Sequence, residues 1–466
     1  MRVRYTGLLL PGGGDRVRPG EFVVGGGRFE AFGQPGELAG SGVDAEVPFG
    51  GRLVVPGAID GHVHFDDPGF GWRENFATGT RAAAAGGVTT VVDMPCTSLP
   101  PVTTRAALRN KLEVVAPKAV VDFMLWGGIS GNAVEDPQWE RHAADLADDG
   151  VGAFKLYMLS GMDTFRELTP DRMVAALRAL ARLGVPAGVH AEDRPLVMEL
   201  TAARRAAGGC TPLDYAASRP AEAEIRAVEA LIGMGRKTGA RVHVVHLGSG
   251  VALDRIRAAA GDGVAVSAET CPHYLAFTRS DLAVQGALLK TAPVVKEPAD
   301  RDRLWAGLSD GSLQHVATDH AAGEWPSEKT TGSIWTDYGG IPGVELLLPF
   351  LFSEGVAKGR ITLERMTELV SSAPARFFGV AGRKGRLAPG FDADFAVLDP
   401  DEQWKVEAAG LHNLNRYTPF EGWTFTGRVL ETWVRGRRSY ARTADEAWFG
   451  DPGTGRFVRR DRAEAA

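Results

Sequence analysis

The 466-residue sequence has little cysteine and no long hydrophobic run, and both scarcities narrow the kind of protein it encodes. Three cysteines, Cys96, Cys210 and Cys271, are too few for a disulfide framework and favour a reducing compartment. The longest apolar run, near residues 346–352, is far too short to span a bilayer, and the apolar stretch at the N-terminus is too short for a signal peptide. We therefore expect a cytoplasmic protein.

The sequence also lacks an excess of basic charge. Its net charge is −6, so we expect neither a nucleic-acid partner nor a membrane partner. The hydrophobic content of 44% and the charged content of 24% are ordinary for a globular protein. No short-period repeat or low-complexity segment is present. The length allows one large barrel with a smaller module beside it.

From about residue 54 the sequence alternates short β-branched runs with alanine-rich amphipathic segments. Residues 221–235 show the helical period, with apolar residues from Ile225 to Ile232 on one face and Gly235 as the expected end, and 170–183 repeat it. The eight strand candidates are residues 54–65, 89–95, 120–128, 151–158, 185–192, 241–248, 264–272 and 315–321. Eight strands, most of them followed by a helix, predict an α/β fold built on a parallel (β/α)8 TIM-like barrel.

Both ends of the chain differ from the middle in composition and in their pattern of apolar residues. Residues 1–53 are rich in glycine with short apolar runs, and residues after about 380 return to strand patterns. The simplest topology joins 1–53 and 379–445 in one small composite β domain beside a barrel of residues 54–378. Residues 446–466 form a polar tail, of which we expect 452–466 to be loosely held.

Metal-ligand residue types occur at the strand ends where barrel enzymes place their chemistry. His62 and His64 end the first strand, and because strand side chains alternate, both rings point the same way. The full set is His62, His64, Lys155, His190, His246 and Asp319. Imidazole and carboxylate suit Zn²⁺, with Co, Mn or Fe as alternatives. Taken singly, each residue fits a structural role, but their convergence on one mouth favours a metal centre.

Lys155 is the unusual member, because a protonated lysine repels cations. Burial or nearby positive charge makes the proton easier to lose, and a neutral amine can add CO₂ to become an anionic carbamate with two oxygens. A carbamylated Lys155 would bridge two metal ions. His62, His64 and Asp319 would then hold one ion, and His190 and His246 the other.

The remaining histidines carry weaker expectations. His243 lies three residues before His246 and should point away from the site by strand alternation. We expect His142 and His412 at the surface and His315 in a structural role. For His273 and His320, near the mouth, an orienting role and plain packing are equally open.

These residues resemble the amidohydrolase superfamily, specifically its cyclic amidohydrolases: allantoinase, dihydropyrimidinase or hydantoinase, and dihydroorotase. The resemblance covers nearly the whole chain. Its motifs are PGAIDGHVHFDDPG (56–69), FATGTRAAAAGGVTTVVDMP (76–95), GAFKLYM (152–158), VHAED (189–193), DYAASRP (214–220), HVVHLGS (243–249), AETCPHYL (268–275), ATDHA (317–321), GGIPGVE (339–345) and GRLAPGFDADFAVLDP (385–400). It implies a binuclear metal barrel, a carboxylated Lys155, a β domain formed from both termini, and a homotetramer.

Within this group the chain resembles allantoinases most. Dihydroorotases carry an arginine two residues after the second histidine to hold the substrate carboxylate, whereas Asp66 stands here and would repel it. Cys96 also departs from the dihydroorotase pattern. Hydantoinases carry a tyrosine five residues after the lysine, where this chain has Ser160. Departures from the allantoinase pattern at Thr97, 291–294 and 320–322 flank the substrate pocket.

The resemblance implies hydrolysis of a cyclic amide C–N bond in a ureide ring, from allantoin to allantoate, with Asp319 transferring the proton. A hydantoinase-like or dihydroorotase-like cyclic amidase is the alternative, and a non-enzymatic scaffold is disfavoured because all six ligand positions are filled. The expected substrate contacts are Ser160, Ala292, Gly340 and Pro342. Residues 323–340 could form a mobile lid or an ordinary ordered loop, and the sequence does not separate the two.

Overall fold

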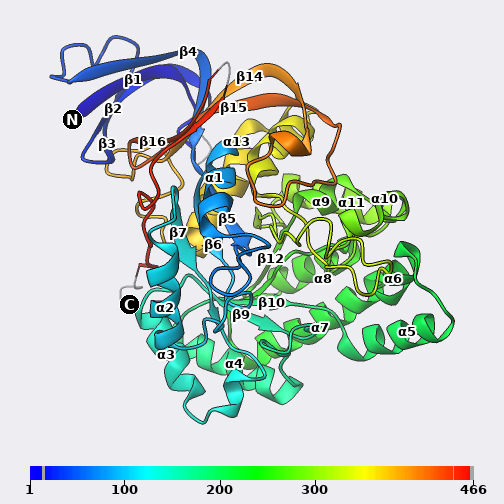
Figure 1. Cartoon of the computed structure of the whole chain (residues 1–466). Coiled ribbons are helices and arrows are strands. Elements are labelled where there is room, and N and C mark those ends of the chain that lie inside the picture. Colours follow the sequence, from blue (N-terminus) through cyan, green and yellow to red (C-terminus); the bar gives the residue numbers. More distant parts are fainter. Residues whose placement is uncertain (13–15, 444–445, 462–466) are drawn as a thin grey trace.

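The computed structural model describes residues 1–12, 16–443 and 446–461, which form a barrel with a β domain beside it (Figure 1). Both the N-terminal and the C-terminal strands lie in the β domain, and the intervening chain winds around the barrel. The predicted fold class is confirmed by this arrangement.

Among the described residues, eight strand positions close the parallel barrel. They are β5 Ala58–Val63, β6 Val88–Asp93, β7 Asp122–Leu125 with its short continuation β8 Gly127–Gly128, β9 Phe154–Tyr157, β10 Ala187–His190, β11 Val242–Val244, β12 Val266–Thr270 and β13 His315–Val316. One sheet has the order β5-β6-β7, and a second runs from β8 to β13. The ring closes where the His64 N–H donates to the His320 carbonyl at 2.7 Å.

Helices form the outer layer of the barrel, and their buried faces pack against the strands. The helices are α1 Phe76–Ala85, α2 Arg105–Val115, α3 Trp139–Asp148, α4 Pro170–Leu183, α5 Arg194–Ala206, α6 Pro212–Ser218, α7 Ala221–Thr238, α8 Gly250–Gly261, α9 Pro272–Ala276, α10 Arg279–Gln285, α11 Pro298–Asp310, α12 Leu347–Phe350, α13 Leu363–Thr367 and α14 Ala373–Phe377. The expected end of the helix at Gly235 is wrong, because α7 continues to Thr238. Gly239 ends it instead, because its φ of 71° forms a left-handed cap that donates to the Gly235 carbonyl.

Within the described chain, the β domain is one eight-stranded sheet of order β17-β16-β15-β14-β4-β1-β2-β3. Its strands are β1 Arg2–Leu9, β2 Arg18–Gly25, β3 Arg28–Gly33, β4 Ala45–Pro56, β14 Phe395–Lys405, β15 Thr424–Val434, β16 Arg437–Arg442 and β17 Ala447–Phe449. The two ends of the chain meet where β4 pairs antiparallel with β14. Aromatic rings fill its core, with Tyr5 and Phe22 stacked at 5.0 Å and Phe395 and Trp433 at 5.6 Å.

The single strand expected over 54–65 is divided between the two domains. Residues up to Pro56 belong to β4 of the β domain, and β5 of the barrel begins at Ala58. Gly57 lies at the division, and its N–H donates to the Asp394 carbonyl at 3.0 Å. The apolar run is continuous in sequence because both strands are buried, so hydrophobicity does not mark the boundary.

The expectation of a loosely held end is wrong for residues 452–461, and 462–466 lie outside the described residues. β17 adds to the sheet, and the following segment runs along the free edge of β7. The Phe123 N–H donates to the Arg456 carbonyl at 3.0 Å, and the Val458 N–H donates to the Phe123 carbonyl at 2.8 Å. Val458 is buried. The tail therefore lies along β7 and is held there by its backbone.

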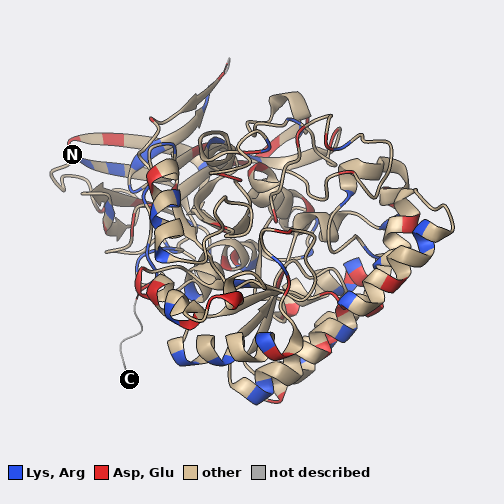
Figure 2. Ribbon diagram, turned by 60° about the horizontal axis from the view of Figure 1, so that its bottom comes forward, with Lys and Arg blue, Asp and Glu red and all other residues tan. Residues whose placement is uncertain are grey.

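Acidic and basic residues are interspersed along the outer helices (Figure 2). No helix of the described residues is both long and apolar enough to cross a bilayer.

Candidate metal centre and substrate cavity

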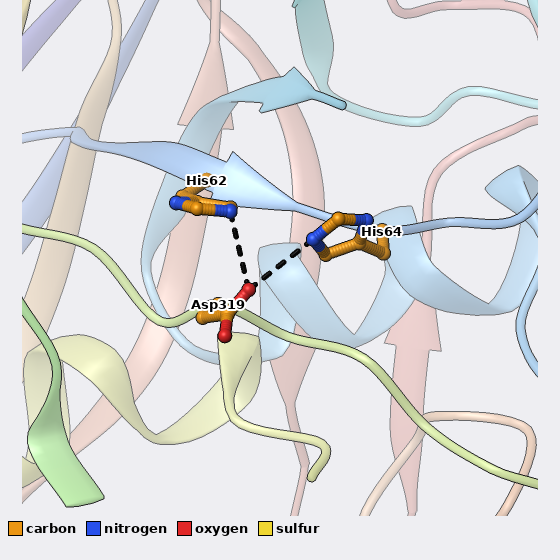
Figure 3. Close-up of side chains that lie close together, drawn as sticks. All are labelled: His62, His64 and Asp319. Carbon is orange, nitrogen blue, oxygen red and sulfur yellow. Dashed lines mark ion pairs between the residues drawn. The ribbon is translucent and has the colours of Figure 1, made fainter. Parts of the chain in front are cut away.

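The ends of β5 and β13 bring His62, His64 and Asp319 together (Figure 3). Oδ1 of Asp319 lies 3.1 Å from Nε2 of His62 and 3.2 Å from Nε2 of His64. The two imidazoles and the carboxylate are therefore close enough to share one cation, which is the first half of the predicted site.

His190, at the end of β10, and His246, just after β11, face each other. Nδ1 of His190 lies 3.1 Å from Nε2 of His246, and the ring of His246 lies 5.3 Å from that of His62. The two predicted half-sites are therefore adjacent at one barrel mouth, which Asp319 and both histidine pairs share.

Lys155 extends from β9 and is fully buried. Its Nζ has no hydrogen-bond partner in the described structure, and it lies 4.8 Å from the centre of the Tyr157 ring. Burial lowers the pKa of Lys155, because an unpaired ammonium is costly away from water. This buried, unpartnered amine is the group that a carbamate requires.

The ionisation of four of the other side chains also fits a cation site, whereas Cys96 and Asp319 outweigh burial and raise the pKa of His64 to about 10. Burial lowers the pKa of His62, His190 and His246, which favours the neutral imidazole that binds metals. Burial alone would raise the pKa of Asp319, but the neighbouring histidines outweigh it and hold that pKa well below its usual value. The donor set is thus three neutral imidazoles, the His64 ring, one carboxylate and one amine, and it fits two divalent cations.

Two of these side chains are aimed by unusual backbone. His246 has a φ of 43° and Asp319 a φ of 50°, in the left-handed region that non-glycine residues rarely adopt. Such conformations cost about 1–3 kcal/mol and concentrate at functional sites. His246 lies two residues after the end of β11 and Asp319 three residues after the end of β13, so each left-handed residue lies where the chain leaves a strand at the mouth.

A buried carboxylate beneath the centre, Glu269 on β12, was missed by the sequence analysis. It lies 2.6 Å from Nδ1 of His62, 2.9 Å from Nε2 of His315 and 3.3 Å from Nε2 of His243. The bond from His62 fixes the ring so that Nε2 faces the site. The glutamate stood in the motif AETCPHYL, but its role depends on histidines from three other strands.

His243 does not lie as strand alternation predicted. Its ring is fully buried inside the barrel and stacks on that of His315 at 5.0 Å. Burial lowers the pKa of His243 to about 4. His243 and His315 therefore hold Glu269 in place, and Glu269 in turn contacts the candidate ligand His62.

A second carboxylate, Glu192, holds the other half-site. Its Oε2 lies 2.8 Å from Nε2 of His190 and is also paired with Arg219. Burial would raise the pKa of Glu192, but Arg219 and His190 lower it to about 2. The ionised carboxylate thus orients His190 so that Nδ1 faces His246.

The remaining histidines take structural positions. Nδ1 of His320 accepts from the Gly343 N–H at 3.1 Å, and its Nε2 lies 3.3 Å from Glu74. His273 is buried against the Tyr274 ring at 4.1 Å. His142 and His412 are partly exposed and pair with Asp136 and Glu345.

A cavity of about 540 Å³ opens over the candidate metal ligands. Its walls include Thr97, Tyr157, Tyr215, Lys290, Ala292 and Tyr338. The volume suits a small molecule and lies within the usual range for ligand sites.

The predicted substrate contacts divide into two groups. Ala292 and Gly340 line the cavity, whereas Ser160 and Pro342 are not among its lining residues in the described chain. The Ser160 hydroxyl donates to the Phe165 carbonyl at 2.8 Å and accepts from the Met162 N–H, so it stabilises its own loop. Ser160 was expected at the substrate because of its spacing from Lys155, and the loop turns it away.

Gly340 shapes the wall by its backbone. Its N–H donates to the Lys290 carbonyl and its carbonyl accepts from Lys329, so both groups already have partners. A Cβ at this position would lie 2.4 Å from the Ala321 carbonyl oxygen, which explains the glycine. The backbone of Ala292, by contrast, has no hydrogen bond within the described residues.

Residues 323–340, for which a lid and an ordered loop were both open, are packed in this structure. The buried Lys329 donates to the carbonyls of Tyr338 at 2.9 Å and Gly340 at 2.7 Å. Indole Nε1 of Trp335 donates to the Gly209 carbonyl at 2.7 Å. The segment contributes Trp335 and residues 336–340 to the cavity wall.

Asp66 weakens one argument made from the sequence. It is fully buried and is not among the lining residues in the described chain. Burial raises the pKa of Asp66 well above its usual value. Repulsion between Asp66 and a substrate carboxylate is therefore not supported, and the missing arginine alone argues against dihydroorotase.

Comparison with known proteins shows the class to which this fold and site belong. Residues 53–438 match the Amidohydrolase family, and the chain belongs to that family, in its cyclic amidohydrolase group of allantoinases and hydantoinases. An allantoinase of Streptomyces avermitilis is 39% identical over 467 residues, covering 98% of both chains. A D-phenylhydantoinase of Escherichia coli is 36% identical over 89% of both. The solved L-hydantoinase (dihydropyrimidinase) of Arthrobacter aurescens superposes with a TM-score of 0.92 at 30% identity, covering 98% of this chain and 99% of that one.

Proposed function

We propose that this chain hydrolyses the cyclic amide C–N bond of allantoin to give allantoate. The observation that carries the proposal is the convergence of six potential ligands at one barrel mouth, with the buried and unpartnered Nζ of Lys155 among them. The choice of allantoin is supported by the allantoinases of Streptomyces avermitilis and Rubrobacter xylanophilus, which are 39% and 38% identical.

The proposed cofactors are two divalent ions, with zinc as the first choice and cobalt, manganese or iron as alternatives. His62, His64 and Asp319 would hold one ion, His190 and His246 the other, and a carbamate on Lys155 would serve both. When bound, such ions polarise a carbonyl and lower the pKa of water to about 7.

Asp319 is the proposed proton carrier. Its Oδ1 faces both histidines of the first half-site, and its side chain keeps an exposure of 13% toward the cavity. The histidines hold the pKa of Asp319 low, so the carboxylate is ionised and has no proton before the water attacks, and we propose that it takes the proton which the water releases. It then delivers that proton to the ring nitrogen, which leaves poorly as an anion.

The cavity wall supplies the proposed substrate contacts. The unpaired backbone groups of Ala292 would meet the N–H and C=O edge of the ureide ring, and Gly340 allows the ring to approach. We also retain the homotetramer and the cytoplasmic location as predictions.

A hydantoinase-type activity is the second candidate. It is favoured by the TM-score of 0.92 to the Arthrobacter L-hydantoinase and by the 36% identity to the E. coli D-phenylhydantoinase. Both candidates use the same reaction on rings that differ in their exocyclic substituent.

A substrate panel separates the candidates. Purified protein with zinc and bicarbonate is assayed on allantoin, hydantoin, dihydrouracil and dihydroorotate. We expect kcat/KM to be highest on allantoin by at least about tenfold, a discrimination of about 1.4 kcal/mol. Absence of allantoin turnover, with clear turnover of another ring, would assign the second candidate.

A further inference from the structure

One phenol in the cavity stands directly above the metal-binding side chains. Tyr157 is the last residue of β9, two positions after Lys155, so strand alternation places both side chains inside the barrel mouth. Tyr157 lines the cavity and is 8% exposed. Its ring lies 4.8 Å from Nζ of Lys155.

The Tyr157 side chain reaches from one half-site to the other. Its ring stacks on the His190 ring at 5.3 Å and an interplanar angle of 24°. Its hydroxyl lies 3.3 Å from Sγ of Cys96, which in turn lies 3.8 Å from Nδ1 of His64. The hydroxyl is thus placed over the junction between the half-sites, where a carbonyl under attack must lie.

The hydroxyl is also free to act. Its partner among the described residues is a sulfur atom, which is a weak hydrogen-bond acceptor, so an oxygen can replace it at little cost. The hydroxyls of Tyr215 and Ser160, by contrast, are engaged: that of Tyr215 donates to the Thr291 carbonyl at 2.9 Å, and that of Ser160 to the Phe165 carbonyl.

We propose that Tyr157 is a catalytic residue whose hydroxyl donates a hydrogen bond to the oxygen of the scissile carbonyl as that oxygen becomes an anion. This inference rests on the proposed cyclic amide hydrolysis. The Ser160 hydroxyl, which is bonded within its own loop, is not free for this role.

The step is balanced without any further reactant. The water oxygen forms a bond to the carbonyl carbon while the π pair moves to the carbonyl oxygen, and Asp319 takes the proton that the water releases. The Tyr157 hydroxyl keeps its proton and stabilises the negative oxygen. When the carbonyl re-forms, the C–N bond breaks, its pair goes to nitrogen, and the proton on Asp319 follows to that nitrogen.

The test is Tyr157→Phe, which removes the hydroxyl and keeps the ring on His190. Using the ring that the wild-type protein opens fastest in the panel, we expect kcat to fall about 10²- to 10³-fold, as for other oxyanion donors, with KM changed less than about threefold. Metal content per chain should equal that of the wild type. Ser160→Ala is the matched control, because it removes a hydroxyl beside the site that does not face the cavity, and its kcat should fall less than about threefold.

Three results would overturn the inference: a kcat for Tyr157→Phe near that of the wild type, a loss of metal in that variant, or an equal loss in Ser160→Ala. If Tyr157→Phe does not fold, fluorinated tyrosines at 157 keep the side chain's size, and kcat must change with the acidity of the phenol. An unchanged kcat across that series would also overturn it. Failure on allantoin by the wild type is a separate result, which rejects only the proposed substrate.

Discussion

Lys155 is the residue through which the two half-sites would be joined. Lys155→Ala removes the amine and leaves a buried space beside His62 and His246, so we expect the purified variant to lose most of its metal and its turnover. Short carboxylic acids such as acetate, added with zinc, should restore part of the activity because they supply an oxygen ligand in that space. Metal analysis with and without rescue is the measurement.

The matched control for that variant is Lys290→Ala. Lys290 is also a buried cavity lysine, but its Nζ donates to the Asp337 carbonyl and does not face the ligands. It should keep the wild-type metal content. Unchanged turnover in Lys155→Ala would remove the carbamate from the proposed chemistry.

Glu269 is predicted to position His62 for metal binding. Glu269→Gln keeps the shape but cannot accept hydrogen bonds from three histidines with both side-chain atoms. We expect zinc affinity to fall about 10- to 100-fold, measured as zinc retained against a competing chelator.

Glu224→Gln is the control for Glu269→Gln, because Glu224 is equally buried but pairs with Lys296 and touches no ligand. It should lower stability and leave zinc affinity near that of the wild type. Equal zinc loss in the two variants would show a general effect of burying an amide rather than a role for Glu269.

At the scale of residues, the sequence predicted the candidate ligands that the structure brings together, but not the side chains that orient them. His62 and His64 are recognisable because their alternation and position at a strand end are local properties. Glu269 and Glu192 have no local pattern, since their partners come from other strands or from Arg219 in another helix–loop segment. Ser160 was placed at the substrate by its spacing from Lys155 alone. The loop directs its hydroxyl toward its own backbone and away from the cavity, and no simple sequence signal predicts this.

At the scale of elements, the strands were predicted well and their ends less well. Periodicity identified all eight barrel positions, and 170–183 matches α4 residue for residue. The positions of His243 and His246 required more, because the left-handed φ of His246 breaks the alternation that the prediction used. Continuous burial likewise hid the division between β4 and β5 at Gly57.

The segment 323–340 is predicted to become more stable as pH rises because of Lys329. Burial, with help from Lys290, lowers the pKa of Lys329 to about 7, although Asp337 and Glu328 oppose that shift. Between pH 7 and about 10 the unfolded chain therefore binds a proton that the folded chain does not, so the free energy of unfolding rises with pH.

Lys329→Met lacks this titration. From pH 7 to pH 9 we expect the stability of the wild type relative to Lys329→Met to increase by about 2 kcal/mol, followed as a widening difference in Tm. A difference in Tm that is the same at both pH values would show that Lys329 stays charged between the carbonyls of Tyr338 and Gly340.

At the scale of the whole molecule, the chain closes on itself twice. β14 joins β4 in the β domain, and the segment after β17 returns to the edge of β7. The composition of that last segment is polar, so its packing was not predictable from hydrophobicity. Its hold comes from backbone hydrogen bonds to Phe123 and from one buried side chain, Val458.

Deletion of residues 451–466 should therefore destabilise the barrel rather than trim a free end. Losing the burial of Val458 and its backbone hydrogen bonds costs about 3–5 kcal/mol, which for a chain of this length corresponds to a fall in Tm of about 3–5 °C. Val458→Ala in the full chain should give a smaller fall of the same sign. An unchanged Tm in the deletion would mean that the tail contributes nothing to the closed barrel.

Metal removal links the site to the stability of the whole barrel. The potential ligands come from β5, β9 and β10 and from the turns after β11 and β13, so ions bound there would join strands around the ring. Binding that favours the folded state raises its stability by RT ln(1 + [L]/Kd), about 4 kcal/mol at a thousandfold excess over Kd. Treatment with a chelator should therefore lower Tm and abolish turnover, and both should return with about two zinc ions per chain in the presence of bicarbonate.

Lys155→Ala should respond far less to the chelator because it holds little metal at the start. Full turnover with fewer than one ion per chain would contradict the two-ion centre, and recovery at one ion would reduce it to a single half-site.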